Sequence, residues 1–155
     1  TPSYGLLHTS ASKLIREERA LPEWNSDKRV SDVADNQVAL ASAVARYNGK
    51  GVRLLLDGHF VLIDDQGQFI ALAVDVFRSL NLSSVVLIEA PAATVGERLK
   101  MRDGCDRDLR WLNDFLQKER EIAAATCQEL GLPLYIVVSP NDAEFEQAVA
   151  TGLAG

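Results

Sequence analysis

The stretch Val52-Arg53-Leu54-Leu55-Leu56-Asp57-Gly58-His59 joins an apolar run to a carboxylate, a glycine and a histidine. Two further apolar runs, Val85-Val86-Leu87-Ile88 and Leu134-Tyr135-Ile136-Val137-Val138, also lack regular alternation with polar residues. Strands that are covered on both faces of a parallel sheet have this pattern. The three runs therefore predict three buried parallel strands, and Tyr4-Gly5-Leu6-Leu7-His8 is a weaker candidate for a fourth.

Helical patterns separate these strands and predict a doubly wound α/β fold in one domain over residues 1–155. Ser10 or Ser12 is expected to cap the first helix and Asn141 the last. Two short apolar runs on either side of residues 64–68 predict a β-hairpin appended to the sheet. The predicted helices cover residues 12–20, 32–47, 75–80, 91–101, 109–130 and 142–153.

The amino-acid composition argues against some classes of binding partner. The 155 residues are 47% hydrophobic and 25% charged, with 16 Lys and Arg against 22 Asp and Glu and a net charge of −6. The hydrophobic and charged fractions are typical of one globular domain, and the acidic balance argues against nucleic acid or an anionic membrane as the main partner. No apolar run is long enough to predict a membrane span. The two cysteines form no CxxC pair or disulfide framework, which favours a cytoplasmic location.

Polar residues follow each predicted strand. Ligands of open α/β sheets bind beyond the carboxyl ends of the strands, so these residues are the candidates for a site. Asp57 stands at the position from which P-loop proteins hold Mg²⁺ or its water shell, although a carboxylate there is equally often a turn residue. The segments after the strands are 8–13 with Arg16, Asp57-Gly58-His59, Glu89-Ala90-Pro91 and Ser139-Pro140-Asn141-Asp142.

A second concentration of charge lies around Asp103-Gly104-Cys105, between two predicted helices. An arginine-rich junction that contains glycine can close over phosphates and neutralise their charge. The alternative is a solvated helical face with ion pairs, and composition alone favours that alternative. The basic residues of this segment are Arg98, Lys100, Arg102, Arg107 and Arg110.

Taken in order, these segments resemble P-loop proteins of the nucleotide-kinase type, near the archaeal-type adenylate kinases and related small AAA-type ATPases. The resemblance covers almost the whole chain. It implies a three-layer α/β/α fold with a mostly parallel sheet and the hairpin appended to it. The matching stretches are residues 9–17, 55–60, 86–91, 97–103, 107–108 and 136–139.

The resemblance also implies roles for individual residues. Ser12 and Arg16 fall in the acceptor-nucleotide region, where Arg16 would contact the acceptor phosphate, and His59 would face the acceptor. Asp57 would hold Mg²⁺ through a bound water and act as a catalytic residue.

Two further groups of residues carry roles under the same resemblance. Ser139 and Asn141 fall where the last strand and its loop pass the adenine of ATP. Residues 98–110 resemble a lid that closes over the transferring phosphoryl group, with three catalytic arginines: Arg98, Arg102 and Arg107.

One departure from the family pattern is large, because the 155 residues contain no G-x-x-x-x-G-K-[ST] loop. In the family this loop follows a first, central strand that lies between the strands ending here at Asp57 and Glu89. The chain is therefore expected to lack that strand–loop–helix unit, which supplies the phosphate cradle. The expected explanation is an upstream segment. The alternatives are a partner chain or swapped element in the strand position, or direct pairing of the two flanking strands.

The function implied is an ATP-dependent phosphotransferase that uses ATP and Mg²⁺ when complete with its P-loop. It would transfer the γ-phosphoryl group to a small-molecule acceptor. One alternative is a regulatory module that binds or slowly hydrolyses a nucleotide. Another is a non-catalytic interaction domain that has lost its P-loop.

Overall fold

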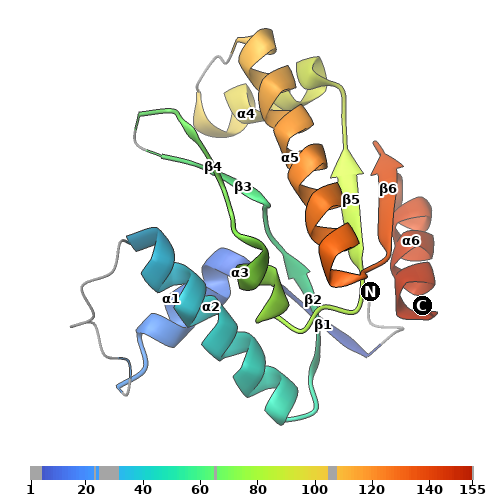
Figure 1. The fold of residues 1–155 in the computed structure, drawn as a ribbon. Helices are drawn as coiled ribbons and strands as arrows, with labels where there is room; N and C mark the ends of the chain where they lie inside the picture. Colours follow the sequence, from blue (N-terminus) through green and yellow to red (C-terminus); the bar gives the residue numbers. More distant parts are fainter. Residues whose placement is uncertain (1–4, 23, 25–31, 65, 105–107, 155) are drawn as a thin grey trace. The chain divides into compact units, whose positions relative to one another are not determined.

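The computed structural model describes residues 5–22, 24, 32–64, 66–104 and 108–154, with the backbone alone at 32, 33, 99, 102, 103 and 154. Strands and helices alternate along most of this chain (Figure 1). In order they are β1 (Leu6–Ser10), α1 (Ala11–Arg19), α2 (Asp32–Gly49), β2 (Arg53–Asp57), β3 (Val61–Ile63), β4 (Phe69–Ala71), α3 (Val74–Arg78), β5 (Val85–Glu89), α4 (Ala92–Asp103), α5 (Leu109–Leu130), β6 (Leu134–Val138) and α6 (Asp142–Ala154).

By its internal contacts the chain divides into two compact units. Unit 1 comprises residues 1–58 and 75–81, and unit 2 comprises residues 59–74 and 82–155. The chain crosses from one unit to the other three times, so the units are not successive segments. The prediction of a single domain over residues 1–155 stays a prediction.

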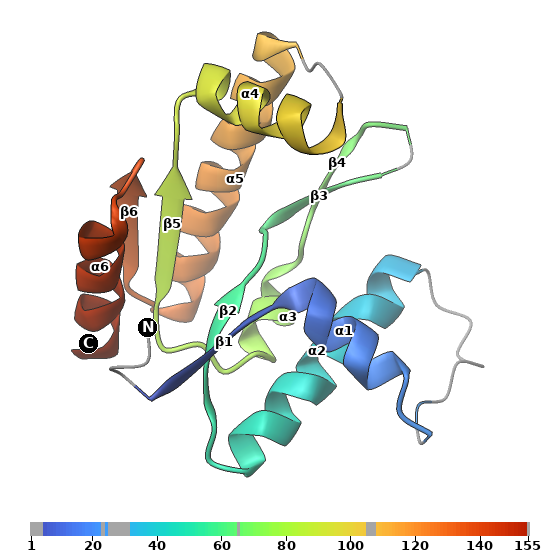
Figure 2. The same cartoon turned by 180° about the vertical axis from the view of Figure 1, so that it is seen from behind.

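Unit 1 is built on the parallel pair β1–β2, in which Leu6 lies opposite Arg53 and Ser10 opposite Asp57. The helices α1 and α2 pack against each other, and Figure 2 shows α1 lying across α2. The core of this unit contains Leu14, which is fully buried. It also contains Ala39, Leu40, Ala43, Val44, Phe77 and Leu80.

A buried carboxylate ties α1 to α2. Glu18 is 5% exposed and accepts hydrogen bonds from the Ser42 hydroxyl at 2.8 Å and from Nε and an Nη of Arg46 at 3.2 and 3.1 Å. Burying a carboxylate is costly unless it is paired and hydrogen-bonded, and these contacts meet that condition. The orientation of α1, which carries Ser12 and Arg16, is therefore fixed by specific polar contacts as well as by apolar packing.

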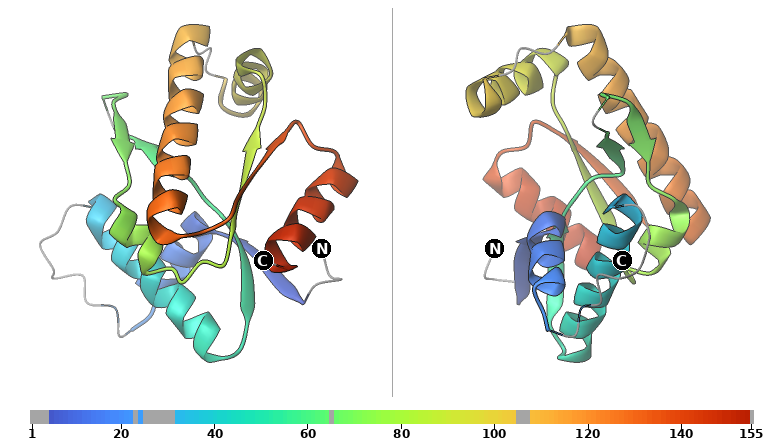
Figure 3. Two further views of the ribbon diagram at one scale, coloured as in Figure 1. Left: turned by 45° about the vertical axis from the view of Figure 1, so that its right-hand side comes forward. Right: turned by 90° about the vertical axis from the view of Figure 1, so that its left-hand side faces the viewer.

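Unit 2 is built on the parallel pair β5–β6, in which Val85 lies opposite Leu134 and Glu89 opposite Val138. Figure 3 shows α5 and α6 on opposite faces of this pair. The helix α6 approaches closely at Gly152, where a Cβ atom would stand 2.6 Å from the Ser84 hydroxyl. Glycine at this position therefore permits the close packing of α6 on the strand pair.

The hairpin β3–β4 also belongs to unit 2 and is antiparallel. Its Phe69 packs against Trp111 and Phe115 of α5, with ring centroids 5.4 and 5.7 Å apart. The Trp111 and Phe115 rings are stacked with centroids 5.8 Å apart. Aromatic contacts of this geometry contribute to packing beyond the area they bury, so Trp111 is a packing residue.

The structure confirms the hairpin, the parallel strands and the mixed α/β character, and Ser10 is the residue that caps α1. In the described residues the strands form three separate two-stranded sheets, so the single three-layer sheet stays a prediction. Within those residues β2 pairs with β1, and β5 pairs with β6. Because β2 and β5 belong to different units, direct pairing between them stays a prediction. No helix in the described part is long and apolar enough to cross a membrane.

Candidate functional site

In unit 1 the carboxyl ends of β1 and β2 bring Ser10 and Asp57 to one edge of the strand pair. The Ser10 hydroxyl caps α1 by accepting a hydrogen bond from the Lys13 N–H at 3.2 Å. Asp57 is exposed, and its carboxylate has no hydrogen-bond or ion-pair partner among the described residues. Its position at the strand end is the one at which the sequence predicts a ligand-binding carboxylate, and ligand binding by Asp57 stays a prediction.

A pocket of about 560 Å³ lies beside α1 in the same unit. Ser12 and Arg16, both predicted as substrate-binding residues, line it together. The Arg16 side chain has no ion-pair or hydrogen-bond partner in the described part of the chain. The remaining lining residues are Ile15, Arg19, Ala20 and Asn36.

The polar wall of this pocket is organised by Arg19. This arginine donates a hydrogen bond to the Asn36 side-chain oxygen at 2.7 Å and forms an ion pair with the buried Asp35 at 3.4 Å. Because the oxygen of Asn36 is engaged, the group that it still offers is its amide N–H₂. With Arg16 and Ser12, the wall offers N–H and O–H donors, which suit an oxyanion such as a phosphate.

Sequence reasoning missed Arg19 and Asn36. Arg19 follows Arg16 by three residues, so the two share a helical face, and that spacing could have indicated the pair. Asn36 comes from α2, 17 residues further along the chain from Arg19. No local pattern connects these two residues.

In unit 2 the predicted residue His59 contacts a buried carboxylate. The Nδ1 atom of His59 lies 3.2 Å from one carboxylate oxygen of Glu119. The other oxygen of Glu119 accepts hydrogen bonds from the backbone N–H groups of Phe60 and Val61, at 2.9 and 2.7 Å. Glu119 is 8% exposed, whereas the His59 side chain is 67% exposed. Glu119 therefore fixes the backbone at the start of β3 and holds one nitrogen of the His59 ring.

Sequence reasoning missed Glu119, although a signal was present. Leu112, Glu119 and Thr126 recur every seven residues in α5 and all are buried. An ionisable residue on the buried stripe of an amphipathic helix requires buried partners.

The residues predicted to bind adenine follow β6 in unit 2. Ser139 has a left-handed backbone with φ of 41°, and its N–H donates to the Glu89 carbonyl at 2.7 Å. A positive φ at a residue other than glycine is uncommon and is often found at binding sites. The Asn141 side-chain oxygen accepts the N–H of Glu144 at 2.8 Å, so Asn141 caps α6 as predicted. Contact of either residue with adenine stays a prediction.

The structure describes the side chain of one of the three predicted lid arginines, Arg98. Arg98 is exposed on α4 in unit 2. Arg102 belongs to α4, but its side chain is not among those described, and Arg107 lies outside the described residues. The lid-like segment over residues 98–110 therefore stays a prediction.

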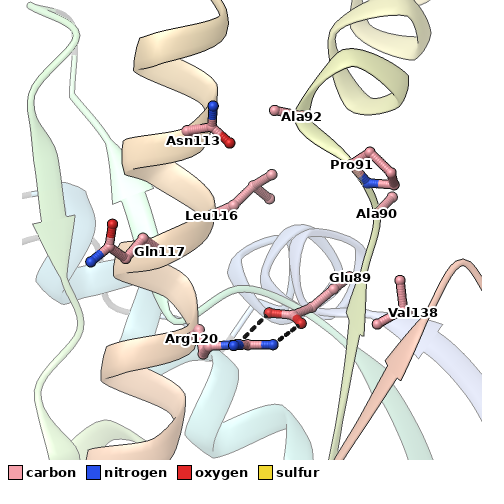
Figure 4. Close-up of a pocket in the computed structure, with 9 residues that line it drawn as sticks. All are labelled: Glu89, Ala90, Pro91, Ala92, Asn113, Leu116, Gln117, Arg120 and Val138. Atoms are coloured by element: carbon pink, nitrogen blue, oxygen red, sulfur yellow. Dashed lines mark hydrogen bonds and ion pairs between the residues drawn. The ribbon is translucent and has the colours of Figure 1, made fainter.

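Unit 2 contains a cleft of about 530 Å³, which lies between α5 and the junction of β5 with α4 (Figure 4). At its base the Arg120 guanidinium makes two hydrogen bonds to the Glu89 carboxylate, one of them from Nε at 2.8 Å. The side-chain hydrogen bonds with Glu89 raise the pKa of Arg120 above its ordinary value. Neither the cleft nor Arg120 was predicted from the sequence.

No group of three or more His, Cys, Asp or Glu side chains gathers among the described residues. A multi-carboxylate metal centre is therefore not formed by that part of the chain. Mg²⁺ commonly takes one or two carboxylates, with waters and substrate phosphates completing its shell. The exposed and unpaired carboxylate of Asp57 fits that mode.

Parallel strands with a free carboxylate at their end, and a donor-lined pocket in the same unit, are features of nucleotide-binding α/β proteins. A family model described as an AAA domain matches residues 2–114. The chain belongs to this family, which places it among P-loop NTPase-like proteins and indicates nucleotide and Mg²⁺ binding in general. No curated protein matches the chain.

Proposed function

We propose that the chain is the acceptor-binding part of an ATP-dependent phosphotransferase of the nucleotide-kinase type. The observation that carries this proposal is the pocket in unit 1, in which Arg16 is unpaired and Ser12 and Asn36 supply further donors. A volume of about 560 Å³ is within the range of small-molecule sites and accommodates a nucleoside monophosphate. The acceptor proposed is therefore a nucleoside monophosphate.

Each residue of the pocket has a defined part in this proposal. Arg16 binds the acceptor phosphate through its planar guanidinium, which matches phosphate oxygens bidentately. Arg19 is held by Asp35 and Asn36, so it shapes the wall of the pocket. Ser12 donates its hydroxyl to the same phosphate.

Asp57 holds Mg²⁺ through a bound water in the proposed enzyme. Bound Mg²⁺ supplies charge neutralisation for phosphoryl transfer. This sequence does not supply the phosphate-binding loop for the triphosphate of ATP, because its 155 residues contain no G-x-x-x-x-G-K-[ST] motif. No residue of the chain is therefore assigned to the β- and γ-phosphates of ATP.

The other predicted roles remain part of the proposal. Arg98, Arg102 and Arg107 neutralise charge on the transferring group, and His59 faces the acceptor. Ser139 and Asn141 pass the adenine, and the positive φ of Ser139 supports a specialised role for that turn.

Two further proposals concern the surroundings of the chain. A strand from an upstream segment or a partner chain pairs with the open edges of β2 and β5. Support comes from their ladders, since each has one partner within the described residues. A cytoplasmic location is supported by Cys127, a buried free thiol whose pKa is raised by burial.

Arg16 provides the direct test of the acceptor pocket. Replacing Arg16 with alanine is expected to weaken the binding of a nucleoside monophosphate by about 10- to 100-fold, the worth of a charge-assisted hydrogen bond. Isothermal titration calorimetry with the four common ribonucleoside monophosphates measures this change.

Lys13→Ala is the matched control, because Lys13 is an exposed basic residue of α1 that does not line the pocket. This variant is expected to bind as the unsubstituted protein does. Equal losses in the two variants would mean that only the general charge of α1 matters. Unchanged binding in Arg16→Ala would remove the acceptor assignment.

A further inference from the structure

The cleft of unit 2 belongs to no role proposed above. Its residues come from α5, from the β5–α4 junction and, at Val138, from the end of β6, and none of them lines the acceptor pocket of unit 1. Figure 4 shows Leu116 and Arg120 pointing from α5 toward the end of β5, whereas Gln117 points away from it. The Gln117 amide donates to Glu121 at 3.0 Å and is therefore engaged elsewhere.

The cleft combines apolar walls with one charged pair. Leu116 stands on the α5 side, and Ala90, Pro91, Ala92 and Val138 stand on the side of the strand ends. Sites for small planar ligands have this composition, with apolar walls and a few polar groups that fix orientation. A volume of about 530 Å³ is large enough for a nucleoside.

The polar groups are Glu89, Arg120 and Asn113. The Glu89 carboxylate accepts two parallel N–H groups from the Arg120 guanidinium. A guanine base carries the same N–C–N arrangement on its Watson–Crick edge, where N1–H and the N2 amino group point in one direction. The Arg120 side chain thus makes with Glu89 the contact that a guanine edge would make.

Adenine and hypoxanthine match this acceptor less well than guanine does. Adenine presents an unprotonated N1 on the same edge, and its lone pair would face the negative charge of Glu89. Hypoxanthine retains N1–H but has no N2 amino group, so it makes one of the two hydrogen bonds. Guanine also has a carbonyl oxygen at C6, next to N1, which an N–H group of Arg120 or Asn113 can satisfy.

A base can reach the Glu89 carboxylate and replace Arg120 as its hydrogen-bond donor. The Arg120 side chain is 54% exposed and that of Glu89 is 20% exposed, so both groups border solvent. A bound guanine edge would supply two N–H donors in place of the two that Arg120 provides, so Glu89 would keep both of its hydrogen bonds in the exchange. The released guanidinium remains beside the ligand as a donor.

We propose that the cleft between α5 and the β5–α4 junction binds a guanine base, with Glu89 accepting N1–H and N2–H while Leu116 and Pro91 contact the faces of the ring. The site is separate from the acceptor pocket and does not depend on the proposed phosphoryl transfer. Guanosine is the suitable probe, because it has no phosphate to bind Arg16.

Calorimetry of the full chain with guanosine, inosine and adenosine tests the proposal. Guanosine is expected to bind, and inosine and adenosine at least about tenfold more weakly, because each leaves a hydrogen-bonding group unpaired. Agmatine, which has a guanidinium but no adjacent carbonyl, is also expected to bind at least about tenfold more weakly. Absent guanosine binding, equal affinity for inosine, or tighter binding of agmatine would overturn the proposal.

Two variants locate the site. Glu89→Gln is expected to weaken guanosine binding by about tenfold or more, whereas Glu129→Gln, an exposed change elsewhere on α5, leaves it unchanged. Near- and far-ultraviolet circular dichroism verifies that both variants are folded. If Arg16→Ala removed guanosine binding and Glu89→Gln did not, guanosine would occupy the acceptor pocket. That result would overturn this inference and leave the proposed function standing.

Discussion

Replacing Asp57 with asparagine is expected to lower the turnover of phosphoryl transfer by about 100-fold, the upper range for groups that act on a metal through its bound ligands. Nucleotide affinity is expected to change little, because the role of Asp57 is to orient water on Mg²⁺. The structure places this carboxylate at the end of β2, exposed and unpaired among the described residues, so the substitution removes no structural contact seen there. Steady-state assays of the natively expressed protein with Mg²⁺, ATP and a nucleoside monophosphate measure the change.

Asp75→Asn is the matched control for this substitution. Asp75 is also an exposed aspartate of unit 1, but its partner is Arg78 of the same helix. Its replacement is expected to leave turnover unchanged. A turnover close to that of the unsubstituted protein in Asp57→Asn would show that Asp57 does not act on the metal.

Replacing Glu119 with alanine is expected to lower the free energy of unfolding by about 3 kcal/mol, because two buried N–H groups lose their acceptor. These are the backbone groups of Phe60 and Val61, both in buried residues. Glu119→Gln is expected to cost less, since its remaining carbonyl oxygen still accepts one of them. Urea denaturation monitored by circular dichroism measures the change.

Glu121→Ala provides the comparison on the same helix. Glu121 is exposed and accepts one hydrogen bond from Gln117, so its loss is expected to cost less than about 0.5 kcal/mol. Similar midpoints for Glu119→Ala and Glu121→Ala would contradict the anchoring role of Glu119.

Local signals account for the elements that the sequence predicted well. The bounds of α5 and β6 are those expected, because a long helical pattern ends at Gly131 and an uninterrupted apolar run follows Pro133. The Gly131 backbone is left-handed with φ of 68°, the conformation in which glycine ends helices. The first strand begins two residues later than predicted, at Leu6, because a short mixed segment has weak boundaries.

Strand pairing was less predictable, because it depends on contacts between distant segments. An apolar run indicates a strand but does not identify its neighbours, and the described strands form three pairs rather than one sheet. The predicted pocket residues Ser12 and Arg16 do come together, because a spacing of four residues places them on one face of α1.

Residues that join a site from another element carry no local signal that identifies their partner. Glu119 contacts His59 across 60 residues, and Arg120 contacts Glu89 across 31. In the sequence alone, Glu119 and Arg120 cannot be told apart from the other charged residues of the same helix. Their roles follow only from burial in the case of Glu119 and from the paired geometry in the case of Arg120.

The proposed enzyme is a phosphotransferase whose acceptor is a nucleoside monophosphate. The most direct measurement is the rate at which the natively expressed protein consumes ATP, with and without each monophosphate, together with identification of the products. A phosphotransferase with this acceptor is expected to consume ATP faster when a monophosphate is present and to convert that monophosphate to its diphosphate in equal amount. ATP consumption that no monophosphate changes, with inorganic phosphate as the product, would exclude a nucleoside monophosphate as the acceptor and identify a regulatory ATPase.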